Sequence, residues 1–482
     1  MRYAKQNTAI FCVLTAALSA FSVLTYSRLL SEKPDGSAVS ALESAMGTEA
    51  QMNYGNDYGM VWSLDGEEIA GIHSCRHPET GRITELFCAA DGYNSVIGSP
   101  SGGLIRSCRS ILLSNTAEIN RQMRCGNSIV TTLHSGAMRT AMRELAAFRE
   151  DTDAGICVVL REGTVLVSAG NNGYDSSAFF QPENYADLYV DYNASPLRKG
   201  SVWKPVSDRM FLVNDELMPD GFSLYINDFP DVSQHTAGSA VIHNWDWNIS
   251  GCYEYTQDGV MYRRFSLSDS LIASSNTYVL RHAEALGLKE SYRLMTELYA
   301  LDKELVTEIN THGVEAVKSD RLPYFFWGQD AVLSNVRLCQ LYNFICTGEF
   351  YAPFYCAQVL QPDGTIIYNA SPEPKQDYKL DVDKEDDILI HAMADTFESY
   401  LTDALKNEFS ADLLSSRRFL AKSGTAENAD SENRVMMLTV LNEDKSDVIC
   451  SACISVNHTT TGISNETLIR KLLLTLQAAD IL

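Results

Sequence analysis

The segment at residues 200–205, Gly-Ser-Val-Trp-Lys-Pro, constrains the fold more than any other stretch of the chain. Ser201 and Lys204 are three residues apart, so a helix that begins here projects both side chains from one face, one turn apart. A helix start also directs free backbone N–H groups and a partial positive charge at the serine oxygen. Pro205 suits the first turn, where a missing N–H costs little. The segment therefore predicts a hydroxyl, an amine and N–H donors together, as covalent acyl transfer requires.

Two later segments bear on the alternative that this is only an ordinary helix start. Residues 274–276 read Ser-Ser-Asn, a Ser-x-Asn pattern, and residues 422–425 read Lys-Ser-Gly-Thr, a variant of Lys-Thr-Gly. Each has a structural interpretation of its own, as a helix N-cap cluster and as a turn. The three patterns in this order, however, are those of the serine penicillin-recognising enzymes.

The sequence also predicts the structural context of the two later segments. Residues 265–287 are expected to form two helices broken at residues 274–276, the second capped by Ser275 or Asn276 and closed by Gly287. Such a junction lets the side chains of the broken turn point into a cleft. Strands are expected at residues 419–421, 435–441 and 448–456. The Lys-Ser-Gly segment is then predicted at the edge of a sheet.

Periodicity predicts further elements. A strand at residues 128–133 leads into a helix with apolar residues at positions 138, 142, 145 and 148. Residues 157–160 and 164–168 flank Arg-Glu-Gly and predict a hairpin. A last amphipathic helix is expected after a cap at Asn465, with an apolar face formed by Leu468, Ile469, Leu472, Leu473 and Leu476.

Length and charge limit the class of protein. A chain of 482 residues is long enough for more than one domain with a full-sized core. Its formal net charge of −24 argues against a nucleic-acid partner, which would require a basic face. The same charge argues against adsorption to anionic lipid.

The N-terminal stretch predicts a membrane segment. Residues 8–26 carry no charge, and Arg2 and Lys5 precede them. As a helix these residues span roughly 28 Å, close to the hydrocarbon thickness of a bilayer. Positive residues before the span place the rest of the chain outside the cytoplasm. A cleaved signal peptide is the alternative, since small residues occur at positions 17–20, but the length favours an uncleaved anchor.

The twelve cysteines predict buried thiols, not a disulfide framework. They are scattered over a long chain, and only Cys450 and Cys453 are close, on opposite faces of an expected strand. His73, Cys75 and His77 lack a fourth ligand of defined spacing, so neither a metal site nor a cofactor is predicted. Thiols of this kind behave as small buried hydrophobes.

From about residue 90 to the end, the chain resembles the class B penicillin-binding proteins, which are peptidoglycan D,D-transpeptidases. Beyond the three patterns, residues 127–133 are similar to the segment that leads into this family's catalytic domain, and the hairpin at residues 155–170 is similar to its first two strands. Gly328-Gln329 resembles the Gly-Gln-Gly turn of the family. Gly424-Thr425-Ala426-Glu427 continues the third pattern as in the family.

The sequence departs from the family at four places. Leu-Arg-Lys precedes Gly200 where Pro-Gly is usual, and Trp203 stands where Phe is common. Asp330 replaces the last glycine of Gly-Gln-Gly, and the Thr-Pro-Leu segment that usually follows is absent. Ser423 stands for threonine and keeps the hydroxyl. The first two departures concern substrate fit, because every hydroxyl and amine of the chemistry is present.

The resemblance implies an α/β (α+β) fold of the penicillin-binding transpeptidase and serine β-lactamase type. An antiparallel sheet covered by helices and an all-helical subdomain would form the two walls of a cleft. The expected organisation is a membrane anchor with a short cytoplasmic tail at residues 1–30, a stalk and α+β pedestal at residues 31–150, and the transpeptidase domain at residues 151–482. The catalytic domain would be extracytoplasmic.

The resemblance, together with the geometry expected of the three patterns, also implies roles for the residues of the first two. Ser201 would attack the penultimate D-Ala carbonyl of a stem peptide. Lys204 would take its proton, which requires a neutral amine; burial and nearby cations lower a lysine pKa in this way. Ser274 would relay the proton to the leaving D-alanine.

The remaining residues are implied to bind substrate: Asn276, Lys422, Ser423, Gly424 and Thr425. Asn276 would hold the donor peptide, and Lys422 with Thr425 would bind its terminal carboxylate. The oxyanion would lie between the backbone N–H groups of Ser201 and Thr425. The implied partners are peptidoglycan stem peptides, β-lactams as covalent inhibitors, and a membrane glycosyltransferase or polymerase.

Two other interpretations remain open. A β-lactamase or a β-lactam sensor uses the same three patterns, although no deacylating base is evident near them and the long N-terminal region argues against a simple lactamase. A degenerate, non-catalytic member would act as a scaffold in a wall-synthesis complex, and the intact Ser201, Lys204, Asn276 and Lys422 argue against it. The role in septation, elongation or sporulation and the acceptor peptide do not follow from the sequence.

Overall fold

The structure is a computed structural model. It describes residues 58–76, 83–90, 92–98, 103–113, 126–148, 152–171, 191–219, 226–230, 235–237, 240–242, 253–257, 259–303, 305, 308, 317–382, 387–427, 431–444, 446–458 and 463–482. The membrane segment predicted at residues 8–26 lies outside these ranges. Among the described residues, no helix has both the length and the apolar character needed to span a bilayer.

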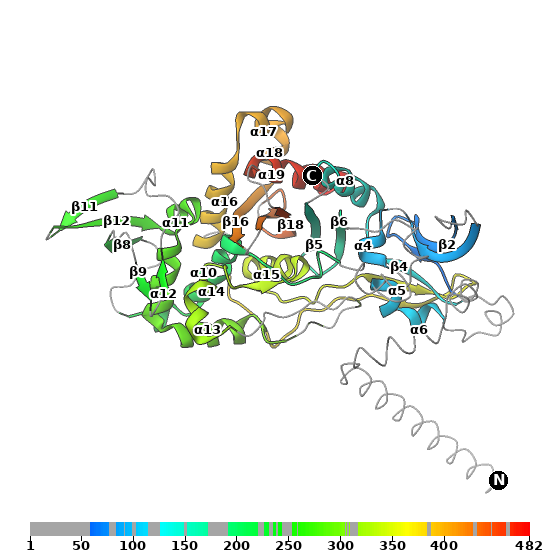
Figure 1. Cartoon of the computed structure of the whole chain (residues 1–482), viewed down its shortest axis with the longest axis horizontal. Helices are drawn as coiled ribbons and strands as arrows, with labels where there is room; N and C mark the ends of the chain where they lie inside the picture. The colour runs from blue at the N-terminus through cyan, green and yellow to red at the C-terminus, as the bar shows by residue number, and fades with distance from the viewer. Residues whose placement is uncertain are drawn as a thin grey trace, which may run out of the picture. The chain divides into compact units, whose positions relative to one another are not determined.

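A five-stranded antiparallel sheet forms the centre of the structure (Figure 1). Its strands, in spatial order, are β16 (Arg418–Glu427), β17 (Glu432–Leu441), β18 (Val448–His458), β5 (Asp153–Leu160) and β6 (Val165–Gly170). The middle strands are almost wholly buried because both faces of the sheet are covered, which explains their nearly continuous apolar runs. The predicted hairpin and the three predicted C-terminal strands are confirmed, and β16 is an edge strand.

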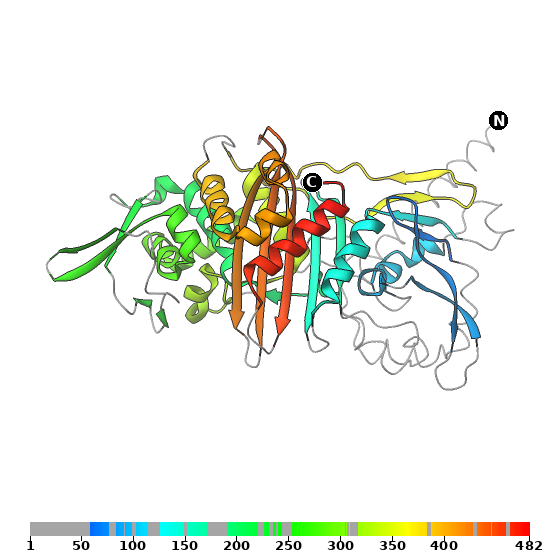
Figure 2. The same ribbon diagram turned by 90° about the horizontal axis from the view of Figure 1, so that it is seen from above.

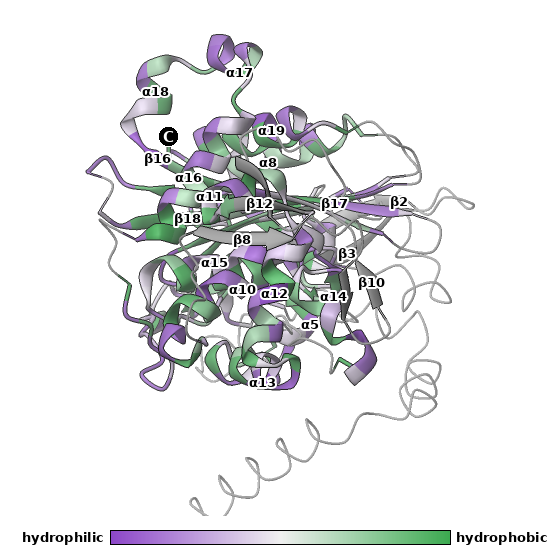
Figure 3. Ribbon diagram, turned by 90° about the vertical axis from the view of Figure 1, so that its left-hand side faces the viewer, coloured by the Kyte–Doolittle hydropathy of each residue, from purple (hydrophilic) through white to green (hydrophobic). Residues whose placement is uncertain are grey.

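Helices cover the two faces of this sheet (Figures 2 and 3). On one face α8 (Ser135–Leu145) packs against β5 and β6, and α19 (Asn465–Ala478) packs against β17 and β18. On the other face α15 (Asn335–Thr347) packs against β5 and β18. Figure 3 shows apolar residues concentrated along the sheet and the helix faces that meet it. The core of the structure therefore lies on both faces of the sheet, between the sheet and the helices that cover it.

The last helix, α19, packs its predicted apolar face against the sheet. All five residues of its predicted apolar face are fully buried. One detail of the prediction is wrong: the N-cap is Ser464, whose side chain accepts a hydrogen bond from the N–H of Thr467, and Asn465 is already the first helical residue. A serine hydroxyl one residue earlier satisfies the free N–H groups of the first turn equally well.

A helical region lies beside the edge strand β16. It contains α10 (Lys204–Val213), α11 (Leu267–Ala273), α12 (Asn276–Leu286), α13 (Leu288–Leu298) and α14 (Leu322–Phe326). The break between α11 and α12 is at the predicted position, and Gly287 ends α12 as predicted. The helix α16 (Ile388–Tyr400) packs against both α11 and β16, and so joins this region to the sheet.

A buried ion pair fixes α10 against α16. The guanidinium of Arg209 donates two hydrogen bonds to the carboxylate of Asp387, at 2.6 and 2.8 Å. The same carboxylate accepts from the N–H groups of Leu389 and Ile390 and caps α16. Both charged side chains are buried, and each guanidinium nitrogen at the end of Arg209 donates to a different oxygen of Asp387. The orientation of α10, which carries Lys204, is therefore set from outside the helix.

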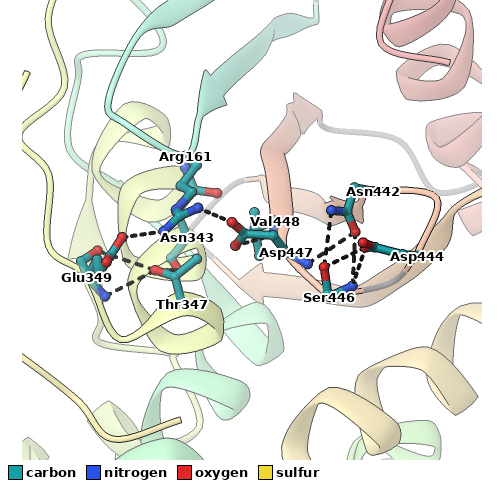
Figure 4. Close-up of polar contacts among 9 residues, drawn as sticks. All are labelled: Arg161, Asn343, Thr347, Glu349, Asn442, Asp444, Ser446, Asp447 and Val448. Carbon is teal, nitrogen blue, oxygen red and sulfur yellow. Dashed lines mark hydrogen bonds and ion pairs between the residues drawn. The ribbon is translucent and has the colours of Figure 1, made fainter. Parts of the chain in front are cut away.

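A second polar cluster closes the far end of the sheet (Figure 4). Arg161, in the turn between β5 and β6, forms ion pairs with Glu349, which follows α15, and with Asp447, which precedes β18. The side chain of Asn343 on α15 donates to the carbonyl oxygens of Val159 and Leu160, at 3.1 and 3.0 Å. These contacts fix the position of α15 on the strands that it covers.

A six-stranded sheet combines segments that are distant in sequence. Its strands, in spatial order, are β15 (Ile366–Asn369), β14 (Cys356–Leu360), β4 (Ser128–Thr131), β1 (Val61–Trp62), β2 (Glu68–Arg76) and β3 (Ile83–Ala89). The strand predicted at residues 128–133 is confirmed as β4. Two strands of this sheet come from beyond residue 150, which the sequence did not predict. The domain boundaries themselves remain a prediction.

The remaining described elements are short. They are α4 (Asn94–Ile97), α5 (Gly103–Ser107), α6 (Arg109–Leu112), β7 (Leu197–Arg198), η3 (Gly200–Trp203), η4 (Asp215–Leu217), β8 (Ile226–Pro230), β9 (His235–Ala237), β10 (Ala240–Ile242), β11 (Tyr253–Gln257), β12 (Val260–Ser266), η5 (Ser319–Arg321), β13 (Val332–Leu333), α17 (Asp403–Glu408) and α18 (Ala411–Ser416). The strands β11, β12 and β8 form a three-stranded sheet, and β7 pairs with β13.

The cysteines whose side chains are described are all free and buried, namely Cys108, Cys157, Cys339, Cys346, Cys356, Cys450 and Cys453. This confirms the prediction of buried thiols for these seven residues. They pack as small apolar side chains in the core, as is usual for free cysteine.

Candidate active site

The segment that carries Ser201 and Lys204 begins a helix, as predicted. Residues Gly200–Trp203 form the 3-10 turn η3, which continues directly into α10 with Pro205 in its first turn. A 3-10 turn places residues three apart one above the other, so Ser201 and Lys204 share a face. Ser201 is partly exposed and Lys204 is fully buried. Ser201 is thus partly open to solvent, whereas Lys204 is not.

Backbone hydrogen bonds hold this segment against a tight turn. The N–H of Gly200 donates to the carbonyl of Gly328 at 2.9 Å, and the N–H of Lys199 donates to the carbonyl of Ala331 at 3.1 Å. Gly328 has φ +96°, and a Cβ added there would overlap the carbonyl oxygen of Gly200. The position of the serine therefore depends on glycine at position 328, because no side chain fits between the two backbones.

The side chain of Ser274 lies between two lysines. Lys204 Nζ donates to Ser274 Oγ at 3.0 Å and to the carbonyl oxygen of Ser274 at 2.5 Å. Lys422 Nζ donates to the same Oγ at 3.1 Å and to the carbonyl oxygen of Ser423 at 2.8 Å. One residue from each of the three sequence patterns is thus joined in a single hydrogen-bonded chain, although the patterns are far apart in the sequence.

Ser274 has a backbone conformation that non-glycine residues rarely adopt. With φ +53° and ψ +45° it is in the left-handed region, at the junction of α11 and α12. Such conformations cost about 1–3 kcal/mol and persist where the surrounding structure enforces them. Ser275 is the N-cap of α12, accepting from the N–H of Tyr278 at 3.2 Å, and partly exposed Asn276 is the first residue of that helix. The two predicted alternatives for the cap are thus resolved in favour of Ser275.

Burial changes the ionisation of both lysines. Loss of solvent lowers the pKa of Lys204 well below its ordinary value, and the charge of Lys422 lowers that pKa further. Burial lowers the pKa of Lys422 to about 7. An amine with a depressed pKa is a free base near neutral pH, so Lys204 can accept a proton from a neighbouring hydroxyl.

The edge strand β16 lies directly against the backbone of Ser201. A Cβ added at Gly424 would lie 2.8 Å from the nitrogen of Ser201 and 2.7 Å from the nitrogen of Val202, so only glycine allows this approach. Ser423 directs its N–H away from β17, toward the hydroxyl of Tyr400. Thr425, two residues further along the edge strand, directs its N–H to the same side. The outer edge of β16, where the N–H of Thr425 lies, therefore runs beside the backbone of Ser201.

No family model and no curated protein matches the sequence. Among solved structures, the D,D-transpeptidase domain of a peptidoglycan glycosyltransferase from Eggerthella lenta aligns with a TM-score of 0.65 at 17% identity, over 89% of this chain and 100% of that one. Penicillin-binding protein A from Mycobacterium tuberculosis, as a ceftriaxone acyl-enzyme complex, gives 0.66 at 13%, over 89% and 99%. Penicillin-binding protein 3 of that organism gives 0.62 at 15%, over 88% and 96%.

The chain has the penicillin-binding transpeptidase fold. The similarity covers 89% of this chain and 99–100% of those two structures, so it is not confined to the segments around the three patterns. The resemblance inferred from the sequence is thereby confirmed at the level of the fold.

In this penicillin-binding fold, Ser423 forms hydrogen bonds that the sequence analysis did not predict. Its hydroxyl pairs with the hydroxyl of Tyr400 at 2.8 Å and accepts from the side-chain amide of Asn465 at 3.4 Å. Arg434, opposite Thr425 on β17, donates to the oxygen of Asn465 at 3.0 Å. No sequence signal marks these partners, because they come from α16, α19 and β17.

The structure accounts for two of the departures from the family pattern. Trp203 is fully buried and packs edge-on against Phe325, with ring centroids 5.4 Å apart, so it belongs to the core and not to the substrate surface. Asp330 accepts two hydrogen bonds from Arg321, at 2.6 and 2.9 Å. Trp203 is thus accommodated by packing against Phe325, and Asp330 by its ion pair with Arg321.

A buried carboxylate close to the lysines was also missed by the sequence analysis. Asp208 is four residues after Lys204 on α10 and is fully buried. Charged residues inside an otherwise apolar buried helix are rare unless they are paired. The pair Asp208-Arg209 within the run from Val206 to Val213 was the signal that could have drawn attention to it.

Within the described part of the chain, no group of three or more His, Cys, Asp and Glu side chains is arranged to hold a metal ion. His77 lies outside the described residues, so the cluster at residues 73–77 is not placed as a whole. The candidate site consists of hydroxyl, amine and backbone N–H groups.

Proposed function

We propose that the chain is a class B penicillin-binding protein, a D,D-transpeptidase that crosslinks peptidoglycan stem peptides through an acyl-enzyme on Ser201. The observation that carries the proposal is the shared hydroxyl of Ser274, which accepts from Lys204 and from Lys422 beside the helix start that holds Ser201. A nucleophile, a neutral amine and a relay hydroxyl are thereby assembled at the edge strand that supplies the oxyanion donors.

In the proposed acylation, Ser201 Oγ attacks the carbonyl carbon of the penultimate D-Ala, and its proton passes to Lys204 Nζ. The N–H groups of Ser201 and Thr425 donate to the resulting oxyanion. The proton then moves through Ser274 to the nitrogen of the terminal D-alanine, which leaves as the amide bond breaks. Lys422 and Thr425 bind the terminal carboxylate, and Asn276 holds the donor peptide.

In the proposed second step, the amine of another stem peptide attacks the ester on Ser201. A new amide bond forms, the ester bond breaks, and the serine hydroxyl regains its proton. A β-lactam follows only the first step, because its opened ring stays attached to the ester carbonyl and blocks the approach of an amine. β-lactams are therefore proposed as covalent inhibitors of this chain.

The experiment that tests the function uses a fluorescent penicillin. We expect one penicilloyl group per chain, on the tryptic peptide that contains Ser201, persisting for many minutes by intact-mass measurement. Ser201→Ala should carry no adduct. A β-lactamase of the same fold would instead return rapidly to the free mass while hydrolysing excess drug. A non-catalytic scaffold would remain unlabelled at every drug concentration.

We also propose that a single N-terminal helix at residues 8–26 anchors the protein in the cell membrane, with its catalytic domain outside the cytoplasm and a membrane polymerase as partner. The support is the uncharged length of that segment and the positive residues before it. The full-length chain should remain in the membrane pellet after a high-salt wash. Recovery of a shortened soluble form that begins near residue 21 would show a cleaved signal peptide instead.

A further inference from the structure

A tyrosine contacts Ser423 through both its backbone and its side chain. Tyr400 is the last residue of α16, which packs against β16. Its hydroxyl accepts a hydrogen bond from the N–H of Ser423 at 3.2 Å and lies 2.8 Å from Ser423 Oγ. That N–H points away from β17 at the edge of the sheet, so the phenol takes the place that a further strand would have.

An asparagine contacts the same serine hydroxyl, and the orientation of its amide is fixed. Asn465 Nδ2, at the start of α19, is 3.4 Å from Ser423 Oγ. The Oδ1 atom of this amide accepts from the guanidinium of Arg434 at 3.0 Å. Arginine can only donate, so the oxygen of the amide faces Arg434 and its NH2 group faces Ser423. Asn465 is therefore a hydrogen-bond donor to the serine.

The contacts of the tyrosine assign the proton that the two hydroxyls share. Among the residues that the structure describes, the O–H of Tyr400 has no acceptor other than Ser423 Oγ. Burial raises the pKa of this phenol, so its proton stays in place over the working range of pH. If Ser423 donated to the phenol instead, the tyrosine proton would have no partner, which is costly for a partly buried group. Tyr400 therefore donates to Ser423.

Ser423 Oγ thus accepts two hydrogen bonds, and its own proton is left for another acceptor. A serine oxygen has two lone pairs and one proton, so the contacts with Tyr400 and Asn465 use both lone pairs. Thr425, two residues further along β16, is exposed and has its side chain on the same face of the strand. That face therefore presents two hydroxyls, and the proton of one of them has a fixed direction.

We propose that Tyr400 is a positioning residue that directs the hydroxyl proton of Ser423 toward the carboxylate of the stem peptide or of a β-lactam. The inference rests on the proposed function and deepens it, because it adds a residue that selects ligands with a carboxylate. A carboxylate can only accept, so a proton directed at it attracts it, whereas a serine lone pair in that place would repel it. Tyr400 itself does not touch the ligand and acts through Ser423.

The test compares benzylpenicillin with its methyl ester, which lacks the negative charge. Tyr400→Phe keeps the ring and removes the donor. It should slow acylation by the acid about fivefold or more and leave the rate for the ester within about twofold, because hydrogen bonds to charged groups are the stronger ones. Tyr368→Phe, at an exposed tyrosine on β15, should change neither rate. Equal slowing of acid and ester by Tyr400→Phe would show a purely structural role and overturn the inference.

A double-mutant cycle tests whether Tyr400 acts through Ser423. Ser423→Ala should slow acylation by the acid about tenfold, the effect of losing a hydrogen bond to a charged group. In that background Tyr400→Phe should not change the acid-to-ester ratio further, because the hydroxyl that it directs is gone. Additive losses would mean that the phenol contacts the ligand itself, and would overturn the positioning role.

A second variant keeps the test valid if Tyr400→Phe does not fold. Asn465→Ala removes the other donor to Ser423 Oγ and leaves the tyrosine in place. It should lower the acid-to-ester ratio in the wild-type background and leave the ratio unchanged in the Ser423→Ala background. Circular dichroism melting shows which variants are folded at the assay temperature. An unchanged ratio in folded Asn465→Ala would contradict the assignment of the serine proton.

Binding without acylation separates this inference from the proposed function. Full-length Ser201→Ala cannot form the ester, so titration with benzylpenicillin and its methyl ester, followed by NMR of the ligand, measures affinity alone. The acid should bind more tightly, and Tyr400→Phe should reduce that preference. Such a preference in a chain that penicillin does not acylate would uphold the inference and overturn the proposed function. Normal acylation with an unchanged acid-to-ester ratio in Tyr400→Phe would do the reverse, and binding of neither ligand would overturn both.

Discussion

Replacement of Lys204 by arginine is expected to slow penicillin acylation of Ser201 by at least about 100-fold, the range that general-base catalysis supplies. Arginine keeps the positive charge but does not release its proton at any working pH. In the structure Lys204 is fully buried, and burial lowers its pKa well below the ordinary value, so the wild-type side chain can be a free amine. The measurement is a time course of intact mass at a fixed penicillin concentration.

A matched control separates the loss of a base from a general effect of Lys-to-Arg replacement. Lys406, on α17, is exposed, and Lys406→Arg should acylate at the wild-type rate. Circular dichroism melting should show that Lys204→Arg is folded at the assay temperature. Near-normal acylation by folded Lys204→Arg would mean that this lysine acts only as a charge and that another group takes the serine proton.

Replacement of Gly328 by alanine is expected to reduce acylation by about 100-fold or more, although residue 328 contributes no reacting group. The added Cβ would overlap the carbonyl oxygen of Gly200 and approach the Cβ of Trp203 to 2.7 Å. The hydrogen bond from Gly200 to Gly328 would then have to lengthen, and the start of η3 would shift. A displacement of about 1 Å at a reacting atom costs this much in rate.

Gly364 offers a control that isolates the steric part of this effect. It also has a positive φ, +85°, but a Cβ added there meets nothing within 4 Å. Both substitutions place a side chain at a positive φ, which costs about 1–2 kcal/mol. Gly364→Ala should therefore lose some thermal stability and keep the wild-type acylation rate. Equal acylation rates in the two variants would contradict the role assigned to the Gly328 turn.

Elements with strong local patterns could be predicted from the sequence. The hairpin β5–β6, the strands β16 to β18 and the apolar face of α19 follow from hydrophobic spacing and turn residues, which are contained in the segment itself. The broken helix at Ser274 was predicted for the same reason. The cap of α19 was assigned one residue too late, because serine and asparagine are both favourable N-caps.

The site could be predicted only in part. Ser201 and Lys204 share one helix start, so their proximity follows from spacing alone. That Ser274 and Lys422 approach them was inferred from resemblance to a family, since spacing along the sequence carries no information across separate elements. The structure supplies the hydrogen bonds that join the two lysines through Ser274.

The sequence by itself determined the helix start at residues 200–205, the edge strand and the apolar faces that must be buried, because helix and strand periodicity are local properties. Only the tertiary structure decided the surroundings of Asp208, which the sequence shows merely as a charged residue beside Arg209. In the folded chain Arg209 pairs with Asp387 on α16, whereas the carboxyl oxygens of Asp208 have no hydrogen-bond partner among the described residues. The ionisation of a buried group depends on the charges packed around it, and these come from segments that are brought together only when the chain folds.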